Sequence, residues 1–287
     1  MKSGALKFFI IGILLIINLY FVFTLNSLKN AKTYFDTEEI KEAVEVLNKK
    51  GVKIDAKKVI TKKEVPDVLK TDFVQSSIEN VAKKVMQEDF GSFAIPDGQR
   101  FANEKESLSF YYDYSFEYVL PHYEFDVNRI KGKLNFSYAY GEETEEKYNS
   151  AFDNLFDNFN SGDYKIHLKI RRIFQEENMT YIEAVECIDS YEINGAHVYA
   201  ALDGEKVVFA SGKLYFFQST SGYKSDAMDS INILFELDKK EEEITKMELV
   251  YLPVPDHNNS FYFVPTYKFT YSNSDVELFD ATSGTKR

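Results

Sequence analysis

The stretch Leu108–Leu120, LSFYYDYSFEYVL, alternates its side chains with a period of two. Every even position carries a large apolar or aromatic residue, whereas the odd positions read Ser, Tyr, Asp, Ser, Glu and Val. This pattern is typical of a strand with one buried face. We expect the even face to pack as core under a helix, and Tyr111 and Asp113 on the odd face to contact a partner protein. Thirteen residues at about 3.3 Å each would span roughly 43 Å, so the strand is expected to bend or bulge.

The rest of the chain mixes such alternation with helical periodicity. Apolar residues recur every three to four positions at 36–50, at about 142–160 and at 227–239, which predicts three helices. Alternation predicts strands at 123–127, 134–140, 164–174, 180–190, 195–203, 206–218, 245–252, 260–271 and 275–281. Because a helix followed by antiparallel strands occurs twice, we predict an α+β fold built from tandem modules of antiparallel β-sheet covered by helices.

One apolar run lies near the N-terminus. Residues 8–25 read FFIIGILLIINLYFVFTL, without a charge, which is long enough to cross a bilayer. No small-residue cleavage site follows, so the run favours an uncleaved signal anchor. We predict a single-pass protein of the cell membrane with its N-terminus cytoplasmic and its C-terminal domain extracytoplasmic. The predicted parts are a cytoplasmic flank (1–7), a transmembrane anchor (8–25), an N-terminal α+β region (26–140), a first helix-plus-sheet module (141–222) and a second one (223–287).

Asn18 is the strongly polar residue of this run. An amide in hydrocarbon is stabilised by a hydrogen-bonding partner, which makes Asn18 a candidate for recognition of another helix. Ile11, Phe21 and Val22 share its helical face and are candidate contacts. In the alternative interpretation, Asn18 lies near the interface and is satisfied by tilt or water.

Composition excludes several classes of function. A net charge of −12 disfavours nucleic acid, because that affinity comes mainly from Lys and Arg on phosphates. The single cysteine, Cys187, excludes intramolecular disulfides and Cys-based zinc sites. We expect no nucleic-acid partner and no cofactor.

The sequence shows no recognisable catalytic motif. The four histidines are far apart, and HExxH, G-x-S-x-G and glycine-rich phosphate loops are absent from the sequence. Asp256 and His257 are adjacent polar residues, and a solvated hairpin tip explains them better than a metal site. Acidic clusters at 142–146 and 241–243 are interpreted as solvated faces, although carboxylates can pair in space. We therefore expect no enzyme activity and assign no catalytic, cofactor or metal residue.

Three stretches carry a resemblance to a known family. These are LNKKGVKID (47–55), ITKMELVYLPV (244–254) and FVPTYKFTYSNSDVELFDATSG (263–284). Together with the layout they resemble the YycI family, whose closing motif places structural residues at Pro265, Tyr267, Asp280 and Gly284. The chain departs from that pattern at Tyr267, where a Trp is expected, and at Asp280, where an Asn is expected.

The resemblance implies a non-catalytic regulator of a two-component system. YycI and its relative YycH are extracytoplasmic regulators of the WalK sensor histidine kinase, which controls the cell wall. The expected partners are therefore a WalK-like kinase, a YycH-like protein and the membrane, reached through one helix. The alternatives from other classes are an anchored cell-wall hydrolase and a peptidoglycan- or carbohydrate-binding module.

Overall fold

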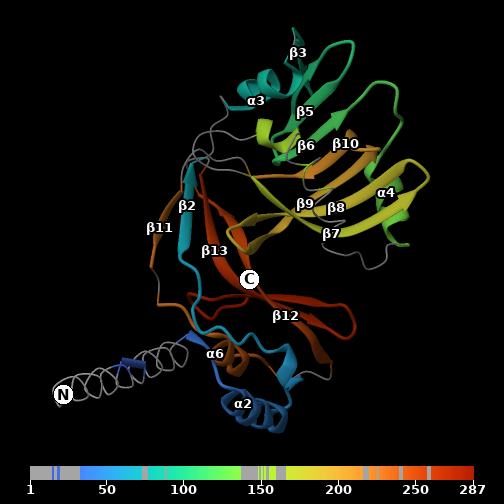
Figure 1. Ribbon diagram of the computed structural model, residues 1–287. Helices are drawn as coiled ribbons and strands as arrows, with labels where there is room; N and C mark the ends of the chain where they lie inside the picture. The colour runs from blue at the N-terminus through green and yellow to red at the C-terminus, as the bar shows by residue number, and fades with distance from the viewer. Residues whose placement is uncertain are drawn as a thin grey trace, which may run out of the picture. The chain divides into compact units, whose positions relative to one another are not determined.

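Figure 1 shows the computed structural model of the chain. It describes residues 15, 18, 19, 33–72, 77–87, 89–136, 148, 150, 152, 155–159, 166–215, 220–224, 226–238, 242–256 and 260–287. The chain forms two compact units. Unit 1 comprises Met1–Pro66, Ser225–Leu249 and Thr266–Arg287, and unit 2 comprises Asp67–Lys224 and Val250–Pro265. The units are thus interleaved along the sequence, whereas the predicted ranges 26–140, 141–222 and 223–287 are contiguous.

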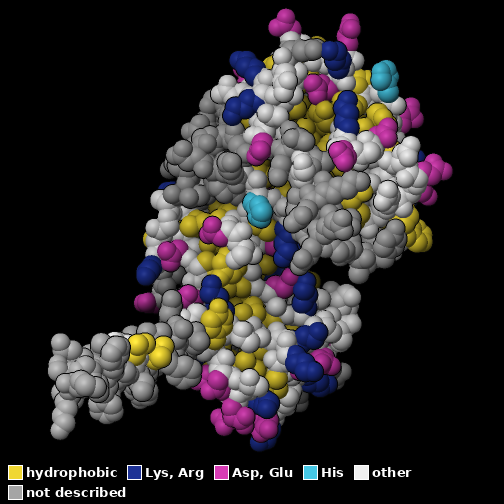
Figure 2. Space-filling view, in the orientation of Figure 1, with side chains coloured by type: hydrophobic (Ala, Val, Ile, Leu, Met, Phe, Trp, Pro, Cys, Tyr) yellow, Lys and Arg dark blue, Asp and Glu magenta, His cyan; other side chains and the backbone are white. Residues whose placement is uncertain are grey.

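Unit 1 is built around one amphipathic helix and a few strands. Its elements are α2 (Thr37–Lys50), β1 (Lys53–Ile54), η1 (Ala56–Lys58), α6 (Ser230–Phe235), the first half of β12 (Glu243–Pro255), the second half of β13 (Ser260–Tyr271) and β14 (Val276–Asp280). β1 pairs in parallel with β12, and β14 pairs antiparallel with β13. Figure 2 shows Asp and Glu side chains over α2, while its inward face joins the core.

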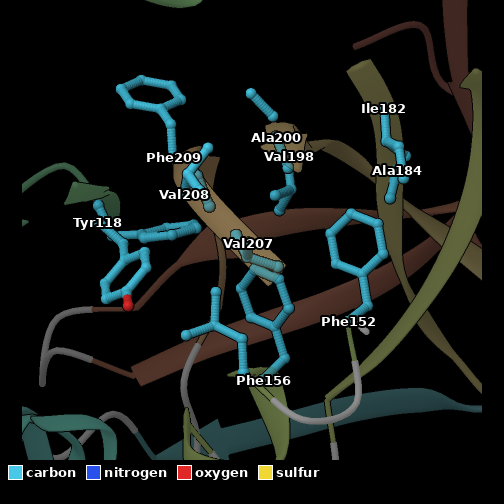
Figure 3. Packing of buried hydrophobic residues seen from close by; sticks show 14 of the residues in the cluster. Tyr118, Phe152, Phe156, Ile182, Ala184, Val198, Ala200, Val207, Val208 and Phe209 are labelled. Atoms are coloured by element: carbon cyan, nitrogen blue, oxygen red, sulfur yellow. The ribbon is translucent and has the colours of Figure 1, made fainter. Parts of the chain in front are cut away.

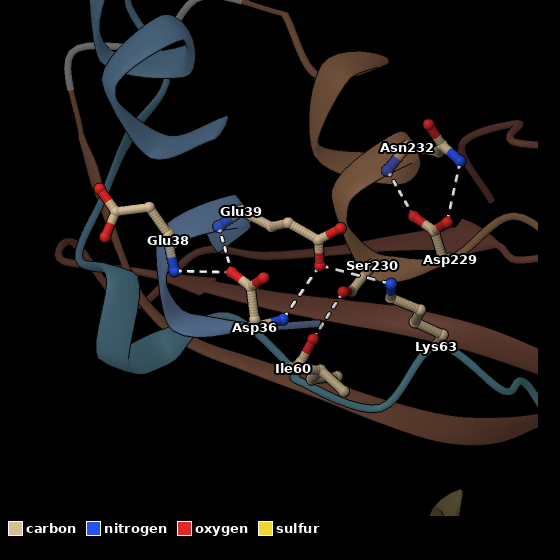
Figure 4. Close-up of polar contacts among 8 residues, drawn as sticks. All are labelled: Asp36, Glu38, Glu39, Ile60, Lys63, Asp229, Ser230 and Asn232. Carbon is tan, nitrogen blue, oxygen red and sulfur yellow. Dashed lines mark hydrogen bonds and ion pairs between the residues drawn. The ribbon is translucent and has the colours of Figure 1, made fainter. Parts of the chain in front are cut away.

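Caps fix where the helices of unit 1 begin. Asp36 accepts hydrogen bonds from the backbone N–H groups of Glu38 and Glu39, and the Glu39 side chain accepts one from the backbone N–H of Asp36 (Figure 4). This is a capping box. Asp229 caps α6 in a similar way, and the Ser230 hydroxyl donates to the Ile60 carbonyl at 2.6 Å, which ties α6 to the segment after η1.

Unit 2 contains most of the sheet. Its elements are β2 (Val68–Asp72), α3 (Ser77–Met86), β3 (Gly91–Ile95), β4 (Gly98–Ala102), β5 (Ser107–Tyr111), β6 (Ser115–Val119), α4 (Val127–Leu134), η2 (Asp157–Phe159), β7 (His167–Glu176), β8 (Met179–Ile188), β9 (Tyr191–Asp203), β10 (Lys206–Lys213), β11 (Thr220–Tyr223) and the remaining parts of β12 and β13. The strand order is β11-β2-β13-β12-β9-β10-β6-β5-β4-β3, and β8 pairs with both β7 and β9. Most pairs are antiparallel, but β9 and β12 are parallel at Ile193 and Tyr251.

The main core of unit 2 packs an aromatic helical segment against the sheet. Figure 3 shows Phe152 and Phe156 beside Ile182, Ala184 and Val207. The predicted aromatic stripe of this segment is confirmed, because all five of its members are buried: Tyr148, Phe152, Leu155, Phe156 and Phe159. Alternation also predicted β7 to β10 correctly to within a few residues at most ends.

The predicted fold class is wrong. The described residues form a large mixed β-sheet of fourteen strands, in place of two antiparallel modules in tandem. The physical reason is that strands from distant parts of the sequence pair with one another, as β1 does with β12 and β2 does with β13.

The predicted single-pass anchor is also corrected. No helix in the part of the chain that the structure describes is both long and apolar enough to cross a membrane. The longest of these helices, α2, has 14 residues and carries charges at both ends. This finding contradicts the predicted transmembrane helix, the signal anchor and the cell-membrane localisation. Within 8–25 only Leu15, Asn18 and Leu19 are described, as exposed helical residues, and Ile11, Phe21 and Val22 lie outside the described residues.

The alternating stretch of 108–120 is a hairpin, in place of one long strand. β5 and β6 pair antiparallel, with Leu108 opposite Tyr118 and Phe110 opposite Phe116. The prediction that even positions pack in the core is confirmed within the two strands. Tyr112, which lies in the turn, is instead 68% exposed. The predicted strands at 123–127 and 134–140 are also corrected, because 127–134 forms the helix α4 and residues 137–140 lie outside the described residues.

Candidate partner-binding site

Two hairpin turns of unit 2 meet at one end of the sheet. The turn between β3 and β4 contains Asp97, and the turn between β5 and β6 runs from Tyr112 to Tyr114. The backbone N–H of Tyr112 donates to the Asp97 carbonyl at 2.8 Å. Gly98 makes this approach possible, because a Cβ at that position would lie 2.1 Å from the Phe110 carbonyl oxygen. The two turns are therefore held side by side by the backbone.

Local hydrogen bonds shape the second turn. The Asp113 carboxylate accepts hydrogen bonds from the backbone N–H of Ser115, at 3.0 Å, and from its hydroxyl. These bonds, with the nearby positive charge of Lys213, hold the pKa of Asp113 below its usual range in spite of partial burial. Tyr114 adopts a left-handed conformation with φ 70° and packs its ring on Tyr215 and Phe261. Asp113 is therefore ionised at neutral pH and fixed in place.

Two hollows open where the turns meet. The larger, which we call the basin, has a volume of about 550 Å³ and is lined by Asp97, Tyr111, Tyr112, Asp113 and Ser115. The smaller, which we call the slot, has a volume of about 150 Å³ and is lined by Ile78, Ala94, Gly98, Gln99, Phe110, Tyr111 and Tyr112. The two tyrosines line both hollows. Figure 2 shows acidic and basic side chains interspersed at the end of the unit where Figure 1 labels β3.

This arrangement suits recognition of a cation. Carboxylates attract Lys and Arg, and tyrosine rings add a favourable cation–π contribution. Exposed tyrosine is also common among the residues that dominate protein–protein affinity. The predicted residues Tyr111 and Asp113 lie together in the basin, but sequence reasoning missed Asp97 and Tyr112.

A second polar cluster lies on β7, β8 and β9. The Glu183 carboxylate, 8% exposed, contacts Arg172, the His197 ring at 3.1 Å and the Tyr199 hydroxyl at 3.2 Å. Burial raises the pKa of Glu183, but the bonds from His197 and Arg172 outweigh it and lower the pKa to about 2. The same environment raises the pKa of Tyr199 to about 12. The cluster is satisfied internally and joins three strands.

A third feature is a cavity of about 530 Å³ beside the turn between β9 and β10. Buried Val85, Tyr118, Leu155 and Val207 line it together with polar Gln87, Asn158, Asp203, Glu205 and Lys206. These residues come from four separate segments. No local motif could have indicated them.

The closing-motif residues are tied into unit 1 and its boundary. The hydroxyl of buried Tyr267 donates to the Met228 carbonyl at 3.2 Å. Buried Asp280 accepts hydrogen bonds from the backbone N–H and the hydroxyl of Thr282, both at 2.7 Å, and contacts Arg287. Gly284 has φ 68°, and a Cβ there would lie 2.9 Å from the Met228 sulfur. Pro265 is buried at the edge of unit 2.

Polar side chains elsewhere suggest no metal centre. Asp256 forms an ion pair with Lys70 at 3.4 Å and accepts from the Ser260 hydroxyl at 3.1 Å, and His257 lies outside the described residues. Over the ranges given above, no group of three or more His, Cys, Asp or Glu side chains is placed to hold a metal ion.

Comparison with known proteins supports the fold only. No family model matches the sequence, and the search of curated proteins found no significant match. An uncharacterized protein from Eubacterium rectale ATCC 33656 has a similar structure, with a TM-score of 0.50 and 12% identity over 82% of this chain and 89% of that chain. The Bacillus megaterium YpeB C-terminal domain aligns with a TM-score of 0.33 and 13% identity over 75% of this chain and 96% of that one, a likeness too low to carry an argument. These comparisons do not confirm the resemblance to the YycI family.

Proposed function

We propose that this chain is a non-catalytic regulatory protein that acts by binding other proteins through the basin. The observation that carries the proposal is the pair of tyrosines between two aspartates, with Tyr112 68% exposed in a hollow of about 550 Å³. The proposed partners are a WalK-like sensor histidine kinase and a YycH-like protein, as the resemblance to the YycI family implies.

The stretches that carry the resemblance contribute to one sheet. Residues 47–55 include β1, which pairs with β12 at Glu243 and Ile244, at the start of the stretch 244–254. Residues 263–284 include β14, which pairs with β13 from Thr266 to Thr270. The three stretches therefore contribute to the sheet of unit 1, as expected if they derive from one ancestral fold.

Regulation by binding requires a difference in affinity. A bound protein shifts a kinase between two states only to the extent that it binds one state more tightly. A rigid site binds its partner more tightly, because little order is lost on binding. The backbone contact between Tyr112 and Asp97 and the bonds from Ser115 to Asp113 provide that rigidity.

The test is direct binding. Purified full-length protein is titrated against the purified sensor kinase and YycH-like protein from the same genome, with biolayer interferometry as the readout. We expect Tyr112→Ala to weaken binding by roughly tenfold or more, as at other aromatic hot spots. Tyr223→Ala, at another half-exposed tyrosine, is the matched control and should leave affinity unchanged. If neither protein binds the wild type, the proposal fails.

The cavity of about 530 Å³ favours a second function, binding of a cell-wall saccharide. Its apolar floor and its rim of amides, two carboxylates and one lysine resemble the lining of small-ligand sites. Calorimetric titration with soluble peptidoglycan fragments tests this idea. Heat that is saturable in the wild type and absent in Asn158→Ala would support it, and no heat with the wild type would refute it.

A further inference from the structure

We propose that the partner adds an extended strand to the free edge of β3 and places a basic side chain in the basin. This inference rests on the proposed function and specifies the chemistry of the partner: an extended segment that carries a Lys or Arg near an apolar residue. Strand addition is a common mode of peptide recognition, in which backbone hydrogen bonds supply affinity and side-chain pockets supply specificity.

The first argument is that β3 is an edge strand. Within the described ranges β3 pairs with β4 alone, and it ends the strand order. Its residues, GSFAI, are exposed or half-buried, with Phe93 55% exposed. They include neither a charge nor a proline, the two features that usually protect an edge against pairing. The strand is therefore open to a further strand.

The second argument is a contrast within the same chain. The outer edge of β14 is closed by the C-terminal residues themselves, through a bridge between Phe279 and Lys286 and a hydrogen bond from the Arg287 N–H to the Leu278 carbonyl at 2.9 Å. That edge thus has both a covering segment and two cations. Because the chain covers the edge of β14 in this way, we interpret the uncovered edge of β3 as a functional feature.

The third argument is the position of the two hollows along β3. Ala94 lines the slot, and Asp97, in the turn that follows β3, lines the basin. Asp97 follows the last residue of β3 by two positions, and side chains on one face of an added strand recur about every 7 Å. One strand can therefore place an apolar side chain in the slot and, about two residues away, a basic side chain in the basin.

Charge complementarity selects the basic side chain. Asp97 and Asp113 both face the basin, and Lys213 lies close enough to Asp113 to lower its pKa. No described residue forms a hydrogen bond or an ion pair with the Asp97 carboxylate, so this group can accept bonds from a partner. An acidic segment would be repelled by both carboxylates.

The test uses the full-length protein and three variants. β3 and β4 are joined by the two-residue turn Pro96–Asp97, and Ile95 pairs with Gly98 across it. The backbone groups of Ile95 therefore point toward β4. Because backbone groups alternate between the two sides of a strand, the N–H of the preceding Ala94 points to the open edge. Ala94→Pro removes that donor, and Asp97→Asn removes the charge. Ser92→Thr is the control, because Ser92 lies on the same strand, lines neither hollow, and keeps its N–H and a hydroxyl in this variant.

The first measurement is affinity for the kinase and the YycH-like protein. We expect roughly tenfold weaker binding for Ala94→Pro and for Asp97→Asn, and no change for Ser92→Thr. If the partners bind the wild type and all three variants equally, strand addition at β3 is refuted while the proposed function stands. Circular dichroism checks that Ala94→Pro is folded. If that variant does not fold, the affinity of Asp97→Asn decides whether the inference holds.

The second measurement separates the inference from the proposed function if neither partner binds. The probes are a fluorescent peptide, acetyl-Thr-Val-Leu-Val-Lys-Thr-amide, and the same peptide with Glu in place of Lys. Saturable binding of the Lys peptide that is lost in Ala94→Pro and in Asp97→Asn would support the inference. Equal binding of both peptides, or of neither, would refute it. Dimers of the full-length protein that disappear in Ala94→Pro would show that the edge pairs with a second copy of the chain, which also refutes a basic partner.

Discussion

Replacement of Asp280 by Ala is expected to destabilise the protein by about 3–5 kcal/mol. Asp280 is 1% exposed and accepts two hydrogen bonds of 2.7 Å from Thr282. Hydrogen bonds to a charged group contribute about 1.5–3 kcal/mol each, and a buried donor without a partner incurs the desolvation penalty. The contact with Arg287, which is 41% exposed, adds no more than about 1 kcal/mol. Asp280→Asn keeps a neutral acceptor and should lose about half as much.

The same residue sets a pH dependence of known sign. Burial raises the pKa of Asp280, but the bonds from Thr282 and Arg287 outweigh it and hold the pKa below its ordinary value. A carboxyl group with a depressed folded-state pKa stabilises the protein above its unfolded-state pKa, and this contribution is lost as pH falls through the folded-state pKa. The difference in stability between wild type and Asp280→Ala should therefore be full at pH 7 and shrink below about pH 4.

Urea unfolding of the full-length protein, followed by circular dichroism, measures both effects. Asp226→Ala is the control, because Asp226 is an exposed aspartate of the same unit whose carboxylate forms no hydrogen bond or ion pair with a described residue. This variant should change stability by less than about 0.5 kcal/mol. A loss below about 1 kcal/mol for Asp280→Ala at pH 7 would refute the assignment of Asp280 as the charged centre of the closing turn.

Three further changes have expected outcomes. Gly98→Ala should cost about 1–3 kcal/mol in urea unfolding and also weaken partner binding, because its Cβ would displace the backbone at Phe110. Glu183→Gln should be less stable than wild type at pH 7 by about 2 kcal/mol, and the gap should close as pH falls from about 4.5 to about 2, the ordinary and folded-state pKa values of Glu183. Tyr267→Phe should lower stability by about 1 kcal/mol in thermal unfolding, through loss of its hydrogen bond to Met228.

The sequence predicted elements better than their assembly. Alternation located β7 to β10 because apolar residues recur along each of these strands, although a bulge places the buried Ile170 and Ile173 of β7 three positions apart. Helical periodicity located the stripe from Tyr148 to Phe159. Alternation at 123–127 predicted a strand wrongly, because residues 123–126 form neither a strand nor a helix and α4 begins at Val127. The interleaving of the two units was beyond local reasoning, since the pairing of β1 with β12 joins residues some 190 positions apart.

Sequence reasoning proposed Tyr111 and Asp113 for the candidate site, but it missed Asp97 and Tyr112. Tyr111 and Asp113 were proposed as contact residues because they lie on the odd face of the alternating stretch, opposite the even face that was expected in the core. Tyr112 was assigned to the core because the even positions face the core in both β5 and β6. The turn between these strands does not interrupt the alternation of the sequence, so the pattern gave no sign of it. Asp97 lies ten or more residues from that stretch and reaches the basin only through the pairing of β4 with β5.

The two aspartates of the basin serve different purposes, and this difference gives a clean test. Asp113 bonds to Ser115 and shapes its turn, so Asp113→Asn is expected to cost stability as well as affinity.

Asp97 is in the left-handed region with φ 58°, a conformation that Asn adopts at least as readily, and its carboxylate has no hydrogen bond to a described residue. Asp97→Asn should therefore leave thermal stability unchanged and weaken partner binding roughly tenfold. The turn likewise does not require the ring of Tyr112, which is exposed to water. Small polar residues are the usual choice at such turn positions. A loss of stability in Asp97→Asn, with affinity retained, would mean that the basin belongs to the fold and that the partner binds elsewhere.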